Sequence, residues 1–236
     1  MDSQSSIRCF ITPNHDCSYL ADKKACNLVI DPQLPLSDVL LGNLLNSGFR
    51  RSGEHIYRPK CQSCQECRSL RVTVRRFKPN RSQRRNLKLN ADLDHFDMGN
   101  GFKQEHFELY CRYLESRHQG SEMSEPSPDE YLNFLTAKNI STHFHEFRRD
   151  GRLLAVAVTD HTPFGLSAVY TFFEPEFAAL GLGIYAVLYQ IKLAEQLGLP
   201  WVFLGYWVKA CKKMNYKTNF RPYELYINEE WRQFEE

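Results

Sequence analysis

Residues 166–207 read LSAVYTFFEPEFAALGLGIYAVLYQIKLAEQLGLPWVFLGYW, and the order of patterns in this stretch decides the fold. An apolar, strand-like segment comes first, and WVFLGYW closes the stretch as a buried strand. Between them, Gly181 and Gly183 open a helical pattern with apolar residues along one face, and Gly198 supplies its end. A strand, a crossover helix and a further strand are typical of a sheet with a helix packed on it.

The residues on either side of this stretch extend the same sheet. HFHEFRRDGRLLAVAVTD, at 143–160, predicts a hairpin that turns at Asp150-Gly151. Apolar residues at helical spacing predict a helix over 104–117, and ELYINEEW near the C-terminus predicts a late strand. The order helix, three strands, helix, strand and tail strand resembles the plan of GNAT-type acyltransferases. We therefore expect an α+β fold in which helices pack on a mixed sheet.

The first half of the chain has a less regular pattern. Residues 36–48, LSDVLLGNLLNSG, predict a short helix that Ser37 can cap. Residues 70–77, LRVTVRRF, alternate apolar and basic side chains, which is typical of a strand with one solvent-exposed face. A break at DMGNGFK follows. We therefore expect a smaller cysteine-containing N-terminal region over 1–97 and a GNAT-like transferase domain over 98–236.

The composition and charge exclude several classes of protein. With 236 residues, of which 42% are hydrophobic and 25% charged, the chain is long enough to bury a substantial core, as an ordinary globular protein does. The first residues lack the apolar segment of a secretory signal, and no apolar stretch approaches the ~18 residues of a transmembrane helix. Eight cysteines in such a chain indicate a reducing compartment, so we expect a cytoplasmic protein with no membrane partner.

A cysteine cluster begins the segment 57–90, YRPKCQSCQECRSLRVTVRRFKPNRSQRRNLKLN. Cys61, Cys64 and Cys67 are separated by two residues each, a spacing that brings thiolates within reach of one tetrahedral ion. The cluster lacks a fourth ligand, and Cys17 in HDCSYL is the preferred candidate among the other N-terminal cysteines. Zinc or an iron–sulfur cluster would fit such thiolates, and free thiols packed as small apolar groups are the alternative.

The rest of this segment is strongly basic, because no acidic residue lies between Glu66 and Asp92. The net charge of the whole chain is only +2, so the positive charge is a local feature. The basic residues are Arg68, Arg71, Arg75, Arg76, Lys78, Arg81, Arg84, Arg85 and Lys88. Forked arginine donors match phosphate, so the segment predicts a polyanion-binding surface. A solvated basic face is the alternative, and an acidic peptide is a second candidate anion.

Aromatic and basic residues also gather in GYWVKACKKMNYKTNFRPYE, near the C-terminus. Tyr206, Trp207 and Tyr216 are candidates for stacking on a base or closing a ligand pocket. Lys213 and Lys217 would add affinity for an anion. The alternative is a core strand followed by an amphipathic loop.

Three further features lie on the predicted sheet. The turn at Gly181–Gly183 exposes backbone N–H groups at a helix N-terminus, where a phosphate or carboxylate can bind; a tight turn without a ligand is the alternative. Asp160 follows one predicted strand and Tyr170 lies inside the next, which makes both candidates for catalysis. A lone aspartate at the end of a strand is, however, more often a turn former.

Several long motifs resemble one protein family. The motifs are HDCSYL, GFRRSGEHIYRPKCQSCQECRSLRVTV, FKPNRSQRR, AVAVTD, GLSAVYTFFEP and CKKMNYKTNFRPYE. They resemble the aminoacyl-tRNA–protein transferases of the arginyltransferase family, most closely its bacterial branch, over nearly the whole chain. The resemblance implies transfer of an amino acid, leucine from leucyl-tRNA in the bacterial branch, to the α-amine of a protein that begins with Asp or Glu. Such transfer marks the acceptor for N-degron degradation.

The resemblance also implies roles for the candidate residues. Transfer from an activated ester requires no cofactor, while the cysteine site of eukaryotic relatives holds zinc or an iron–sulfur cluster. Asp160 would orient the α-ammonium group, and Tyr170 would donate to the ester region or relay a proton. The residues expected to read the acceptor carboxylate are Lys213, Lys217 and Arg85. Those expected to hold tRNA phosphates are Arg75, Arg76, Arg81 and Arg84.

Two other functions fit parts of the sequence. An acetyltransferase of the GNAT type that uses acetyl-CoA would need a basic residue before the glycines of its phosphate loop, and AALGLG has none. A noncatalytic, metal-dependent RNA-binding module would bind RNA with a steep dependence on salt and would form no product.

Overall fold

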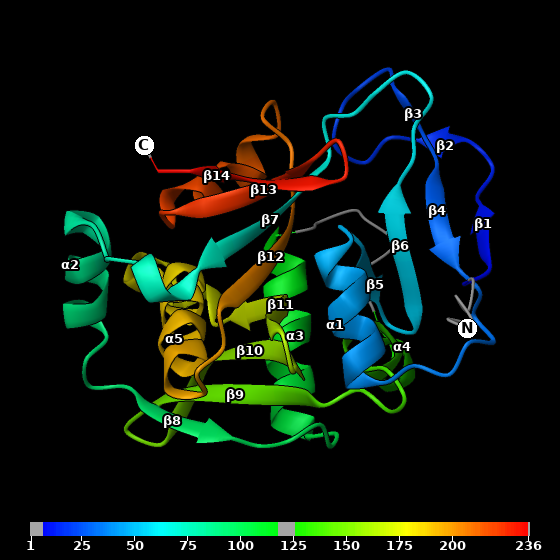
Figure 1. Ribbon diagram of the computed structural model, residues 1–236. Helices are drawn as coiled ribbons and strands as arrows, with labels where there is room; N and C mark the ends of the chain where they lie inside the picture. Colours follow the sequence, from blue (N-terminus) through cyan, green and yellow to red (C-terminus); the bar gives the residue numbers. More distant parts are fainter. Residues whose placement is uncertain (1–6, 118–125, 236) are drawn as a thin grey trace.

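The structure is a computed structural model that describes residues 7–117 and 126–235. Its centre is an eight-stranded sheet, beside which lies a four-stranded sheet of N-terminal residues (Figure 1). In spatial order the strands of the large sheet are β14 (Glu230–Phe234), β13 (Tyr223–Ile227), β7 (Arg68–Thr73), β12 (Trp201–Trp207), β11 (Gly165–Phe173), β10 (Arg152–Thr162), β9 (Thr142–Arg149) and β8 (Asp94–Asp97). β11 and β12 are parallel and their neighbours antiparallel, which confirms the predicted mixed sheet.

Helices pack on both faces of the large sheet (Figure 1). The helices are α1 (Asp38–Asn46), α2 (Arg81–Leu89), α3 (Gln104–Arg117), α4 (Pro128–Leu135) and α5 (Leu182–Gln196). In β10, Ala155 and Ala157 pack with α5, whereas Val156 and Val158 pack with α3 and α4, because successive side chains of a strand point to opposite faces. None of the helices in the described residues has the length and apolar character needed to span a bilayer.

The parallel strands β11 and β12 pair over a very short distance. Their ladder holds only at Leu166↔Val202 and Ser167↔Phe203. The ladder between β10 and β11 shifts register after Val158, and the ladder between β12 and β7 shifts after Phe203. Such irregularities bend strands. Beyond them β11 and β12 part, and the main-chain groups that face the opening have no partner strand.

The N-terminal residues form a second, smaller sheet with the order β1 (Cys9–Ile11), β4 (Asn27–Ile30), β6 (His55–Pro59) and β5 (Arg50–Ser52). A two-stranded hairpin, β2 (His15–Asp16) and β3 (Lys24–Ala25), lies beside it. Ile56 of β6 packs with α1 and with Phe203 of the large sheet in one apolar cluster. The boundary predicted at residue 97 does not coincide with the division between the sheets, because β7 and β8 belong to the large sheet.

The strongly periodic elements agree with the sequence. The predicted helix at 104–117 and the strand WVFLGYW are α3 and β12, and Ser37 caps α1 through the N–H of Leu40. The basic segment differs from the expectation, since α2 follows β7 there and begins with a capping box of Asn80 and Gln83. The late strand is also a hairpin, β13 and β14, rather than one strand.

Three histidine rings stack on the α5 side of β9 and β10. The ring centroids of His143 and His161 lie 3.9 Å apart, and the ring of His145 lies 5.3 Å from that of Tyr189 in α5. Within the described residues, Nε2 of His145 and of His161 is buried without a hydrogen-bond partner. Burial lowers the pKa of each of these two histidines to about 4.

Acidification should therefore destabilise the fold. An unfolded histidine has a pKa near 6.5, so below that pH the unfolded chain binds protons that native His145 and His161 bind only near pH 4. We expect the free energy of unfolding, measured by urea titration, to fall by roughly 1–3 kcal/mol per histidine between about pH 6.5 and pH 4. The variant His145→Phe should show a smaller fall. An equal fall in the variant and the wild type would contradict this account.

Candidate active site

Arg50 reaches from β5 of the small sheet into the opening between β11 and β12. Its Nη2 donates a hydrogen bond to the carbonyl of Val169 in β11, at 2.9 Å. On the other side, Gly205 of β12 has φ +74°, and a Cβ added there would stand 1.6 Å from Nη1 of Arg50. The guanidinium thus fills the place of a side chain at Gly205, and β12 requires glycine at this position.

Lys217 brings a second cation to the same opening. It lies in the 3₁₀ helix η3 (Lys212–Asn219), is only 6% exposed, and donates from Nζ to the carbonyl of Tyr206 at 2.6 Å. Burial and, to a lesser extent, the charge of Arg50 together lower the pKa of Lys217 to about 7. No described acidic side chain forms an ion pair with Arg50 or Lys217, so an anion would be favoured here.

Tyr19 and Tyr206 lie near Arg50, and Tyr170 lies on β11 among aromatic side chains of α3 and α4. Burial raises the pKa of Tyr19 to about 12 and that of Tyr206 well above its usual value, while Arg50 opposes both shifts. Burial also raises the pKa of Tyr170, whose ring packs against Phe134 at 5.3 Å and has Tyr110 and Tyr113 as its other aromatic neighbours. These phenols therefore remain protonated at neutral pH, where they can donate hydrogen bonds to a ligand.

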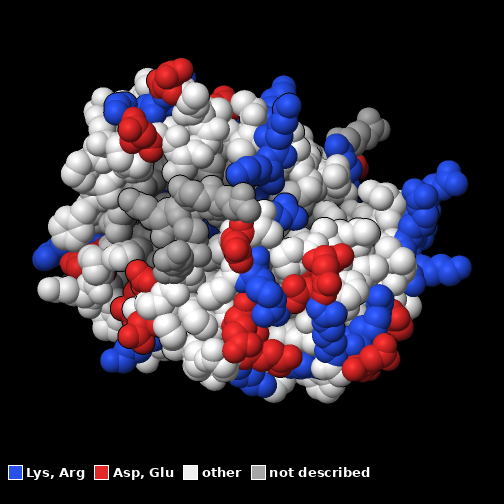
Figure 2. Space-filling view, turned by 180° about the vertical axis from the view of Figure 1, so that it is seen from behind, with Lys and Arg blue, Asp and Glu red and all other residues white. Residues whose placement is uncertain are grey.

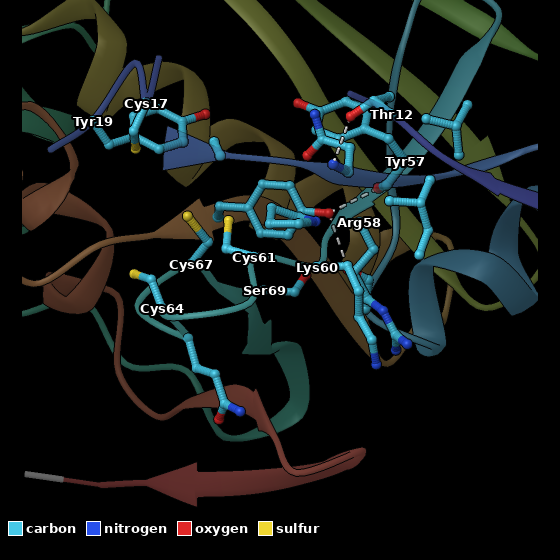
Figure 3. A pocket seen from close by; sticks show the side chains of 18 of the residues that line it. Thr12, Cys17, Tyr19, Tyr57, Arg58, Lys60, Cys61, Cys64, Cys67 and Ser69 are labelled. Atoms are coloured by element: carbon cyan, nitrogen blue, oxygen red, sulfur yellow. Dashed lines mark hydrogen bonds between the residues drawn. The ribbon is translucent and has the colours of Figure 1, made fainter. Parts of the chain in front are cut away.

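A pocket of about 1100 Å³ lies next to the opening and is lined by residues of both sheets (Figure 3). Tyr206 connects the two spaces, since its ring lines the pocket while its carbonyl binds Lys217. The Tyr206 hydroxyl donates to the carbonyl of Tyr57 in β6 at 2.8 Å, a contact that joins the sheets. The 3.7 Å cation–π contact of Arg71 with Trp201 lies on the same strand pair as Tyr206, at the far end from the pocket.

The structure brings the four predicted cysteine ligands to this one pocket. The thiols of Cys17, Cys61, Cys64 and Cys67 gather on one side of it (Figure 3). Burial and, to a lesser extent, the nearby Cys17 together raise the pKa of Cys67 to about 12, so this thiol is protonated. Thiolates suit zinc or an iron–sulfur cluster, yet no group of three potential ligands among the described residues is arranged to hold a metal ion. The metal site remains a prediction.

The predicted phosphate-binding arginines are exposed. Arg75 and Arg76 lie in η1 (Val74–Arg76), where Arg76 pairs with Glu235 at 2.6 Å. Arg81, Arg84 and Arg85 project from α2. Figure 2 views the molecule from behind, so that α2, at the left of Figure 1, lies at the right-hand edge. Basic side chains project from this edge, whereas acidic and basic side chains are interspersed over the rest of the face.

The other predicted residues of the C-terminal segment are divided between surface and interior. Lys213 is exposed on η3, and Tyr216, on the same turn, is 39% exposed. Trp207 is half-buried at the end of β12, and its buried Nε1 has no hydrogen-bond partner in the described chain. Arg85, on the exposed side of α2, is separate from the buried Lys217. Of the three residues predicted to read a carboxylate, Lys217 is therefore the one in the opening.

Asp160 does not fit the catalytic role expected from the sequence. Its side chain is fully buried and both of its oxygens bind Arg51, from Nε to Oδ2 and from Nη2 to Oδ1, each at 2.5 Å. The hydroxyl of Thr142 donates to Oδ1 as well. A carboxylate that is neutralised in the core has no surface for a substrate, so the structure gives Asp160 a role in stability.

The sequence reasoning missed Arg50 and Gly205. Arg50 lies in the motif GFRRSGEHIYRP, where two adjacent arginines could not be told apart. One signal was available for Gly205, because an isolated glycine inside a strand pattern often marks a close approach by another group.

Comparisons with known proteins agree over nearly the whole chain. A family model described as "Arginine-tRNA-protein transferase, N terminus" matches residues 15–85, and one described as "Arginine-tRNA-protein transferase, C terminus" matches 105–227. Relatives named aspartate/glutamate leucyltransferase include a protein of Pseudomonas fluorescens (strain Pf0-1), 49% identical over 231 residues, and one of Pseudomonas aeruginosa (strain LESB58), 48% identical over 231 residues. Each match covers 98% of both chains.

A solved structure shares the fold at low sequence identity. The C-terminal domain of a putative lysylphosphatidylglycerol synthetase from Agrobacterium fabrum matches with a TM-score of 0.53 and 14% identity. The match covers 82% of this chain and 62% of that one. It supports the predicted acyltransferase-like arrangement of helices on a mixed sheet.

Replacing Asp160 by asparagine should reduce stability strongly. The variant leaves the Arg51 guanidinium in the core without its counter-charge, and breaking a buried pair on one side costs about 3–5 kcal/mol. The measurement is the free energy of unfolding in urea. The exposed Glu115→Gln on α3 is the control and should change it little. A loss in Asp160→Asn as small as that of the control would contradict the structural role.

Proposed function

The chain belongs to the arginine-tRNA-protein transferase family, and we propose that it transfers leucine from leucyl-tRNA to the α-amine of proteins that begin with Asp or Glu. The observation that carries the proposal is the near full-length similarity, 49% identity over 98% of the chain, to a relative named aspartate/glutamate leucyltransferase. The cationic opening between β11 and β12 supports it, because an acceptor with an acidic side chain carries the complementary charge. Since aminoacyl-tRNA is a cytoplasmic substrate, we also propose the cytoplasm as the site of action.

The chemistry requires positioning more than activation. The α-amine nitrogen attacks the carbonyl carbon of the aminoacyl ester, a C–N bond forms, and the C–O bond to the tRNA ribose breaks. An α-amine has a pKa near ~8, so a useful fraction is neutral at physiological pH. Holding the amine and the ester together supplies up to ~7–11 kcal/mol in well-oriented reactions. The enzyme therefore needs two adjoining binding sites, a donor for the developing oxyanion and a path for one proton.

The opening between the parted strands supplies these elements. Main-chain groups of β11 and β12 beyond their two-residue ladder can bind an extended substrate, as an added strand would. The protonated Tyr170 on β11 can donate a hydrogen bond to the ester oxygen and pass the proton of the attacking amine to the leaving ribose oxygen. Tyr206, Trp207 and Tyr216 offer aromatic surface to the terminal adenosine or to the leucyl group.

The cysteines have no part in these bond changes. Cys17, Cys61, Cys64 and Cys67 line one pocket but are not arranged around a metal ion in the described structure, so zinc or an iron–sulfur cluster bound by their thiolates would require the loop that carries three of them to rearrange. Transfer itself needs no cofactor, because the ester is already activated.

A transfer assay tests the proposal directly. Purified protein, leucyl-tRNA labelled on leucine and a peptide that begins with Asp should give a labelled peptide, whereas a peptide that begins with Ala should stay unlabelled. Arginyl-tRNA serves as the parallel donor and should give less product. Absence of transfer from every charged tRNA would refute the proposal, and RNA binding without product or saturable binding of acetyl-CoA would favour one of the other two functions.

Reversal of charge on α2 tests the tRNA surface. The double variant Arg81→Glu and Arg84→Glu should raise the KM for leucyl-tRNA and reduce the salt dependence of binding, because each lost phosphate contact removes roughly 0.7–0.9 from the slope of log K against log salt. Thermal stability should be unchanged, since both side chains are exposed. Lys138→Glu, an exposed charge reversal before β9, is the control. An equal effect in the control would place the tRNA elsewhere.

A further inference from the structure

We propose that Arg50, together with Lys217, binds the side-chain carboxylate of the acceptor's first residue and so selects Asp and Glu over their amides. The inference rests on the proposed transferase function and assigns its acceptor selectivity to one pair of cations. Arg50 is the determinant that the sequence did not reveal.

Arg50 is held in place while most of its donors are unused. A guanidinium has five N–H groups in a fixed fork. Within the described residues, the Arg50 side chain makes one hydrogen bond, from Nη2 to the carbonyl of Val169. The main chain of Arg50 pairs with Tyr57 in the small sheet, and Gly205 leaves space for its Nη1. The guanidinium is thus fixed in orientation and retains donors for a ligand.

The neighbouring residue gives the contrast. Arg51 is also buried, but its Nε and Nη2 bind Asp160, its Nη2 also donates to the carbonyl of Leu135, and its Nη1 donates to the carbonyl of Gly53. Arg71 likewise pairs with Glu224. The fold therefore supplies an acid where a buried arginine serves structure. It supplies none at Arg50, although Lys217, whose Nζ is held by the carbonyl of Tyr206 next to Gly205, places a second basic group there.

A side-chain carboxylate fits this place better than a tRNA phosphate. Lys217 is 6% exposed and Tyr206 is 2% exposed, so the ligand must enter a narrow space. A phosphodiester would bring two riboses with it, whereas an Asp or Glu side chain brings one carboxylate on a thin stem. Forked arginine donors match a carboxylate, and its single negative charge would offset part of the mutual repulsion of the two cations. The α-amine of the same residue would remain within a few bonds of the anchored carboxylate.

The selectivity of transfer tests the inference. We would measure kcat/KM for leucyl transfer to two peptides that differ only in the first residue, Asp or Asn. In Arg50→Gln, we expect the value for the Asp peptide to fall roughly 10–100-fold, because a hydrogen bond to a charged group is lost, and the value for the Asn peptide to change less than about 3-fold. Arg50→Lys, which keeps the charge without the fork, should retain part of the preference for Asp.

Matched variants separate selectivity from structure. Arg149→Gln removes a half-buried arginine that binds Asp92 far from the opening, and the ratio of the two kcat/KM values should be unchanged in it. Lys217→Met should lower the ratio as Arg50→Gln does, and it serves in place of Arg50→Gln should that variant not fold.

The outcomes distinguish the inference from the function on which it rests. A wild-type protein that transfers leucine to neither peptide would overturn both. An active wild type whose Asp-to-Asn ratio survives in Arg50→Gln, or whose two values fall equally in it, would overturn the inference alone and leave the transferase function standing.

Discussion

The short pairing of β11 with β12 is the constraint on which the site depends. Two parallel strands that hold register at only two positions must part, because the ladders on both sides of them are irregular. Main-chain groups then need partners other than a neighbouring strand. Arg50 binds the carbonyl of Val169 on one side, and Lys217 binds the carbonyl of Tyr206 on the other. The opening is therefore bounded by cations that the strands themselves hold.

The distribution of charge separates the parts that serve stability from those that serve the ligand. Buried ion pairs such as Arg51–Asp160 and Arg71–Glu224 tie distant segments together and leave no net charge in the core. Arg50 and Lys217 instead place two basic groups close together without an acid, and burial together with the charge of Arg50 lowers the pKa of Lys217. A fold tolerates such an arrangement where a ligand relieves it, which is why perturbed groups concentrate at functional sites.

The periodicity of apolar residues predicted the helices and strands that bury one apolar face. It did not predict a helix that is stabilised by polar contacts. The helix at 104–117 and the hairpin around Asp150 carry apolar residues at regular spacing, and both agree with the structure. α2 has an almost wholly polar sequence, and it is stabilised by its capping box and by Asn86, which donates to the carbonyls of Leu180 and Gly181. No local pattern encodes such contacts.

The candidate site shows the same limit. The spacing of the cysteines and the motif around Cys17 predicted that the four thiols lie close together, and they line one pocket. The role of Asp160 depends on Arg51, which lies 109 positions earlier in the chain, and no local sequence pattern indicates that these two residues form a pair.

The two sheets form a single functional unit. The large sheet contributes the opening and Tyr170, and η3, which connects β12 to β13, contributes Lys217. The fork of Arg50 comes from the small sheet, and the hydrogen bond between Tyr206 and the carbonyl of Tyr57 fixes one sheet against the other. β7, which directly follows the cysteine loop, lies between β13 and β12 in the large sheet. A boundary drawn by sequence at residue 97 would therefore leave the transferase half without β7 in its sheet and without Arg50 in its opening. The N-terminal region thus completes the site rather than being added to it.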